Sequence, residues 1–139
     1  MNALAAYLPP LLCLAAIGQA LIAILNLYLV RLLHWEEPVA RMPLLVREVF
    51  HVHAWFISIT LTIFAVLTWR FAGDLSSLAL GRWLAGGIAL FWGLRAILQV
   101  TYYSSEHWRG HPGPTAVHIT LLIVYGGFTL VYGMAAAGS

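Results

Sequence analysis

Four long apolar stretches alternate with short polar segments along the chain. An α-helix needs about 20 predominantly apolar residues to cross a bilayer, and each stretch is long enough to do so. The expected membrane-spanning helices cover residues of about 9–33, 45–69, 77–107 and 114–134. The pattern therefore predicts an all-α integral membrane protein, a four-transmembrane-helix up-down bundle with short connections, folded as a single domain over residues 1–139.

Helix-start signals support these boundaries. Pro9 and Pro10 suit the first turn of the first helix, where a missing N–H has no partner to lose. Either Ser76 or Ser77 can cap the third helix through its side-chain oxygen. Pro114 fits the first turn of the fourth.

Small residues recur at helical spacing in the last two stretches. Gly86 and Gly93 are seven residues apart, and so are Gly126 and Gly133. Such spacing lets helices approach closely in a membrane. The sequence leaves open whether this approach occurs within one chain or between the protomers of a homo-oligomer.

The composition agrees with a membrane protein and excludes some functions. Hydrophobic residues make up 62% of the chain and charged residues 9%, whereas soluble domains carry about 25% charged residues. The chain has no lysine, which excludes a retinal Schiff base, and its small net charge of +2 gives no sign of nucleic-acid binding. Cys13, the single cysteine, is expected to be a small buried hydrophobe.

All histidines and glutamates fall where the predicted helices emerge on one side of the membrane, whereas Asp74 falls on the other. This histidine-rich face comprises His34, Glu36, Glu37, Glu48, His51, His53, Glu106, His107, His111 and His118. Membrane proteins place polar residues at interfaces anyway, so the segregation is partly a general property. It is nevertheless the main indication of chemistry in the chain.

A metal site is the leading hypothesis for this face. Glu48 and His51 are three residues apart on one helical face. His118 is expected at a similar depth, and carboxylate with imidazole is the ligand set of iron, manganese or zinc in bundle cores. The predicted ligands of an iron or zinc ion are Glu48, His51, Glu106, His107 and His118, with His34 as an additional candidate. A single E-x-x-H motif departs from the ferritin-like di-iron pattern, which has two.

Haem b is the alternative cofactor. Bis-imidazole ligation needs two histidines on different helices at equal depth. His51 and His118 meet that requirement best, because His53 points to the opposite side of its helix from His51.

A second group of polar residues extends from this face into the membrane. Arg95, Gln99 and Tyr102 recur at helical spacing, and Asn26 lies on the inward side of the first helix. Arg95 is eleven residues from Glu106, about 16 Å along a helix, and therefore near the midplane. A charge there costs at least about 2.5 kcal/mol. The group predicts a path for a quinone head group, an anion or protons; alternatively, Arg95 pairs with Glu106 or a backbone carbonyl.

These observations predict a metal-dependent redox protein of a cytoplasmic membrane, acting on a quinone or another lipid-like substrate. The alternatives are a haem b-binding cytochrome and a non-catalytic subunit of a larger membrane complex. More arginines lie at the histidine-rich face than at the other. The positive-inside rule then places this face in the cytoplasm and both termini outside.

Overall fold

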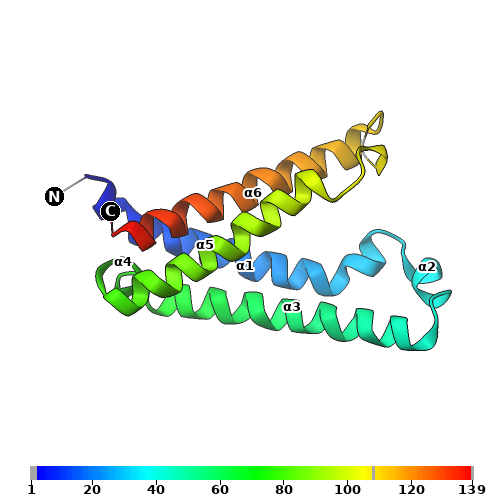
Figure 1. Ribbon diagram of the computed structural model, residues 1–139, viewed down its shortest axis with the longest axis horizontal. Helices are drawn as coiled ribbons and strands as arrows, with labels where there is room; N and C mark the ends of the chain where they lie inside the picture. The colour runs from blue at the N-terminus through cyan, green and yellow to red at the C-terminus, as the bar shows by residue number, and fades with distance from the viewer. Residues whose placement is uncertain (1–2, 108, 139) are drawn as a thin grey trace. The chain divides into compact units, whose positions relative to one another are not determined.

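The computed structural model describes residues 3–107 and 109–138; for residues 3–5 and 107 it describes the backbone alone. Within these ranges the chain is helical and contains no strand (Figure 1). Its elements are α1 (Ala3–Leu32), α2 (Glu36–Ala40), α3 (Leu44–Arg70), α4 (Asp74–Ser77), α5 (Ala79–Thr101), the 3-10 turn η1 (Ser105–His107) and α6 (Pro112–Ala137). Helices α1, α3, α5 and α6 are long and apolar enough to cross a membrane. The predicted class, an all-α membrane protein with four spanning helices, is confirmed.

The chain divides into two compact units. The α5–α6 unit comprises Met1–Leu12 and Phe71–Ser139, and so holds the start of α1 together with α4, α5 and α6. The α1–α3 unit comprises Cys13–Arg70, with the rest of α1, α2 and α3. Each unit is described by itself below.

Aromatic side chains form the centre of the α5–α6 unit. Trp92 of α5 is buried and stacks on Tyr125 of α6, with ring centroids 5.2 Å apart and planes 25° from parallel. The ring of Phe128 lies 4.7 Å from the same indole. Between helices in a bilayer the lipid removes most of the hydrophobic driving force, so close packing of this kind supplies the attraction. Helices α5 and α6 accordingly run side by side (Figure 1).

The glycines of α5 allow this approach to α6. A Cβ added at Gly93 would lie 3.4 Å from the Thr129 Cγ2, and one added at Gly86 would lie 3.7 Å from the Ala136 Cβ. Gly126 and Gly133 of α6 have no described atom in the corresponding positions. The stripe on α5 therefore serves packing within the chain.

Two contacts fix the end of this unit that carries α4 and the last turn of α6. Arg82 of α5 donates from Nε to the Ala136 carbonyl oxygen (3.0 Å) and from Nη2 to that of Ala137 (3.0 Å). It thereby satisfies carbonyls that a helix leaves without partners at its C-terminus. Gly81 lies so close to α4 that an added Cβ would be 2.0 Å from the Asp74 carbonyl oxygen.

A polar cluster joins the two helices of the α1–α3 unit. Asn26 donates from Nδ2 to the Ala54 carbonyl oxygen (2.8 Å) and to the Ser58 Oγ (2.9 Å). The Ser58 hydroxyl in turn donates to the Ala23 carbonyl oxygen at 3.0 Å. Ala23 and Ser58 are both buried. We call this set the Asn26 network.

Some helix ends differ from those expected. Helix α1 begins at Ala3, so that Pro9 and Pro10 lie inside it rather than in its first turn. Leu8 and Leu12 are fully buried there, although a proline inside a helix removes a backbone hydrogen bond. Ser76 and Ser77 lie in or at the end of α4 and donate to the Gly73 carbonyl oxygen instead of capping α5.

Helix α5 ends at Thr101, six residues before the predicted end near His107. The chain then turns, and Glu106 belongs to η1 rather than to the helix of Arg95. Within η1 the Glu106 backbone N–H donates to the Ser104 Oγ at 3.3 Å. Serine hydroxyls compete in this way with helical backbone bonding. Arg95 is consequently six residues, or about 9 Å, from the end of its helix.

Candidate functional site

Three polar side chains of the α5–α6 unit form a continuous chain of hydrogen bonds. Arg95 Nη1 donates to the Gln99 Oε1 at 3.1 Å, one helical turn along α5. The Gln99 Nε2 lies 3.0 Å from the Nδ1 of His118 on α6. Gln99 is 7% exposed, and Arg95 and His118 are half-buried. We call this set the Arg95 network.

Two tyrosine rings flank the guanidinium. Its Cζ lies 5.1 Å from the ring centroid of Tyr125 and 5.6 Å from that of Tyr103. The ring of Tyr125 stacks on Trp92. The Tyr125 backbone carbonyl accepts a hydrogen bond from the Thr129 Oγ1 at 2.8 Å. The site is thus a cation set among aromatic faces, with an amide and an imidazole beside it.

The charge of Arg95 has no acidic partner in the described part of the chain. The ion pair found there joins Arg41 to Glu37, in the α1–α3 unit. Inserting an arginine costs at least about 2.5 kcal/mol, whereas a cation–π contact contributes about 0.5–2 kcal/mol, depending on desolvation. Two such contacts with the Gln99 bond can hold the side chain in place. They do not neutralise its charge, so the site retains an attraction for a negatively polarised oxygen.

The structure places the residues of the predicted ligand path in different surroundings. Arg95 and Gln99 lie together as their spacing suggested, and His118 joins them from α6. Tyr102 is 80% exposed, because α5 ends just before it and the helical stripe is interrupted. Its neighbour Tyr103, which the sequence interpretation did not single out, takes the position beside Arg95. Asn26 belongs to the Asn26 network of the other unit.

The predicted metal ligands are divided between the two units. No group of three or more His, Cys, Asp or Glu side chains in the described part of the chain could hold a metal ion. Glu48 and His51 are exposed on α3, and Glu106 is exposed in η1. The side chain of His107 lies outside the described residues. Because the proposed set is shared between two units, its joint geometry stays a prediction.

His34 has a structural position at the end of α1. Its backbone is in the left-handed region, with φ of 54°, and its N–H donates to the Arg31 carbonyl oxygen at 3.2 Å. The next N–H, of Trp35, donates to the Val30 carbonyl oxygen at 2.8 Å. A left-handed residue with such bonds is a common way to end a helix. His34 therefore ends α1 through its backbone. Its imidazole is exposed and takes no part in these bonds.

One histidine has the hydrogen bond that metal-binding imidazoles typically make. The Nδ1 of His53 lies 2.9 Å from the Val49 carbonyl oxygen, one turn earlier on α3. A carbonyl only accepts, so the ring proton is on Nδ1 and the lone pair is on Nε2. Backbone carbonyls orient ligating histidines in this way. The sequence pattern predicted that His53 points away from the metal site, because it lies on the opposite side of its helix from His51.

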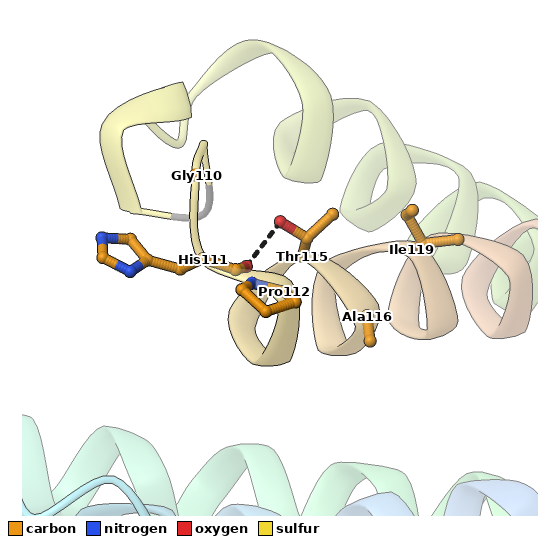
Figure 2. Close-up of a pocket in the computed structure, with 6 residues that line it drawn as sticks. All are labelled: Gly110, His111, Pro112, Thr115, Ala116 and Ile119. Carbon is orange, nitrogen blue, oxygen red and sulfur yellow. Dashed lines mark hydrogen bonds between the residues drawn. The ribbon is translucent and has the colours of Figure 1, made fainter.

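An open hollow of about 500 Å³ lies at the start of α6 (Figure 2). It is lined by Gly110, His111, Pro112, Thr115, Ala116 and Ile119. The Thr115 hydroxyl donates to the His111 carbonyl oxygen at 2.8 Å, and the His111 imidazole points away from the other lining side chains (Figure 2). The hollow therefore offers little recognition chemistry, and the Arg95 network is the better site.

Comparison with known proteins adds no family to this description. No family model matches the chain, and no curated protein or solved structure matches it.

Proposed function

We propose that this integral membrane protein binds a quinone, with the Arg95 network holding an oxygen of the head group, and that it acts in membrane redox chemistry. The observation that carries the proposal is Arg95 itself, a cation inside a membrane-spanning helix with two aromatic faces and no acid beside it in the described residues. A guanidinium donates strong hydrogen bonds to oxygen acceptors. Aromatic side chains suit a planar ring, and they dominate the lining of small-molecule sites.

The choice of a quinone rests on this combination of donor and aromatic surface. A fatty acid would satisfy the guanidinium equally well through its carboxylate, but it gains nothing from the rings of Tyr103 and Tyr125. The cytoplasmic membrane, with the histidine-rich end of the helices toward the cytoplasm, is part of the proposal. The orientation is supported by the excess of arginines at that end.

Binding of a short-chain quinone to the purified protein tests the proposal. The signal is quenching of tryptophan fluorescence, because Trp92 packs against Tyr125. A charge-assisted hydrogen bond contributes about 1.5–3 kcal/mol, so Arg95→Leu is expected to weaken binding by about tenfold to a hundredfold. Arg82→Leu removes a cation that caps α6 in the same unit and should leave binding unchanged.

A long-chain fatty acid is the second ligand in this experiment. If the fatty acid binds in an Arg95-dependent way and the quinone does not, the quinone assignment is wrong, whereas the oxygen-binding site stands. If neither ligand distinguishes wild type from Arg95→Leu, the proposed function is wrong.

Metal or haem ligation is a second candidate function, supported by the hydrogen bond from His53 to the Val49 carbonyl. The expected ligand is the Nε2 of His53, in place of the predicted His51. Elemental analysis and an optical spectrum of protein purified with its cofactor are the first measurements. We expect His53→Ala to lower the metal or haem content and His51→Ala to leave it unchanged; the reverse result would restore the original ligand set.

A non-catalytic subunit of a larger complex is the remaining alternative. A subunit of that kind depends on its partners, so a stable, monodisperse protein purified alone would count against it.

A further inference from the structure

The guanidinium of Arg95 determines which groups donate and which accept along the Arg95 network; we call this order the direction of the network. A guanidinium has N–H donors and no acceptor. The atom of Gln99 that faces Arg95 must therefore be the amide oxygen, as observed at 3.1 Å. The amide nitrogen then faces His118, at 3.0 Å from Nδ1, and it donates. Nδ1 accepts this bond, so neutral His118 carries its proton on Nε2.

A proton added to His118 cannot be accommodated in this arrangement. The imidazolium bears N–H at both ring positions, so its Nδ1–H would face the N–H of the Gln99 amide. Rotation of the amide by half a turn restores a bond, because the Gln99 Oε1 then accepts from the Nδ1–H of His118. The amide nitrogen now faces Arg95, donor against donor, and the Arg95–Gln99 bond is lost. One bond of Gln99 forms at the expense of the other.

We infer that the Arg95 network couples the binding of a negatively charged head group at Arg95 to the uptake of one proton by His118. This inference rests on the proposed function, because it assigns the ligand to Arg95. An anion that takes the place of Gln99 on the guanidinium frees the amide oxygen for His118. The proton comes from water and stays on Nδ1, and the ligand gains a second nearby positive charge.

The groups around the network are compatible with this coupling. On α5 the charged group next to Gln99 is Arg95, since Arg82 lies near the opposite end of the helix and bonds to the end of α6. Beyond the helix end Tyr103 flanks Arg95. On α6 the titratable neighbour is Tyr125. Glu106 and His111 lie in the connection between the two helices and are exposed, and α4 brings Asp74 beside Gly81, near the opposite end of α5. In the described residues Arg95 has no carboxylate partner that takes the place of the ligand.

The same geometry bears on the prediction that His118 ligates a metal or haem. A ligating imidazole needs a bare ring nitrogen toward the metal, and its other nitrogen normally donates a proton to a neighbouring acceptor. In the Arg95 network Nδ1 accepts from Gln99 and Nε2 carries the proton. The network thus favours His118 as a proton-binding group over His118 as a ligand.

The substitution Gln99→Glu tests the direction of the network. A carboxylate only accepts, so Glu at this position forces His118 to present Nδ1–H and reverses its tautomer. Nitrogen NMR of histidine-labelled protein at alkaline pH reports the tautomer, with the His118 signal assigned from its absence in His118→Gln. We expect Nε2–H in wild type, Nδ1–H in Gln99→Glu, and a mixture in Gln99→Leu, the control without either amide group.

Nδ1–H in wild type, or an unchanged tautomer in Gln99→Glu, overturns the inference. If Gln99→Glu does not fold, the wild-type tautomer decides by itself.

Binding of a hydroxynaphthoquinone with an alkyl tail, which stays anionic at neutral and alkaline pH, tests the proton uptake. Linkage of one proton makes the dissociation constant rise up to about tenfold for each pH unit once His118 is neutral. We expect this dependence in wild type and in His111→Gln, which alters an exposed histidine of the same unit, and a flat profile in His118→Gln.

The two proposals fail differently in this experiment. Arg95-dependent binding with a flat wild-type profile overturns the proton coupling and leaves the proposed function intact. Binding that Arg95→Leu does not weaken overturns the proposed function, and the tautomer of His118 then still decides the direction of the network.

Discussion

Asn26 and Arg95 lie equally far from the ends of their helices, but one side chain is neutral and the other is charged. Asn26 is six residues before the end of α1, and Arg95 is six residues before the end of α5. Asn26 is neutral, and its amide nitrogen donates to the Ala54 carbonyl and the Ser58 hydroxyl. Arg95 is charged, and in the described residues it meets two rings and one amide but no acid.

The difference separates a structural polar group from a functional one. In the Asn26 network each donor ends on an acceptor of the same unit, so the cluster holds α1 to α3 and has no use for a ligand. In the Arg95 network the hydrogen bonds are also formed, but no acid in the described residues neutralises the charge of Arg95. An unneutralised charge in a membrane span is costly, and such residues mark binding or transport sites.

Replacing Arg95 gives the largest expected effect, and it should change stability and quinone affinity in opposite directions. Arg95→Leu removes a charge whose insertion costs at least about 2.5 kcal/mol, and Gln99 can turn to accept from a His118 that carries Nδ1–H. Arg95→Leu also removes two cation–π contacts of about 0.5–2 kcal/mol each. We therefore expect the free energy of unfolding in detergent to stay equal or rise by about 1–2 kcal/mol, while quinone affinity falls. A variant that loses both stability and binding would show that Arg95 is a structural group.

Replacing Asn26 should give the opposite combination. Asn26→Leu removes two hydrogen bonds between α1 and α3 and leaves Ser58 with its bond to Ala23. Interhelical hydrogen bonds in membranes contribute about 0.6 kcal/mol on average and at most about 1.7 kcal/mol, so we expect a loss of about 1–2 kcal/mol in unfolding free energy. Quinone binding should be unchanged. Weaker binding in Asn26→Leu would extend the ligand path to this residue, as the sequence pattern suggested.

Helical periodicity was sufficient to predict the four spanning helices and to bring Gln99 into line with Arg95. Apolar length and the spacing of polar residues carry that information directly. It was not sufficient to predict the end of α5. Residues 102–107 contain neither Gly nor Pro, and the pattern therefore continues past the point where the Ser104 hydroxyl competes for the backbone.

The candidate site was harder to predict than the helices, because its members depend on which segments pack together. The sequence pattern placed His118 among metal ligands, since histidines and glutamates cluster at that face. The contact that defines its chemistry is with Gln99, nineteen residues earlier. No local signal specifies this pair, which follows from the packing of Gly93 and Trp92 of α5 against α6.

The smallest expected effect distinguishes the two adjacent tyrosines after α5. Tyr103→Leu removes one of the two rings that flank Arg95, whose contribution at a partly exposed site is about 0.5–1 kcal/mol. We expect quinone affinity to fall by about twofold to fivefold, which corresponds to that energy. Tyr102→Leu is the matched control, because the ring of Tyr102 is 80% exposed and the sequence pattern had favoured it. Equal effects of the two substitutions, measured by the same fluorescence titration, would mean that α5 continues past Thr101 when the ligand is bound. In that case Tyr102 would belong to the site, and the charge of Arg95 would be held by a different set of rings.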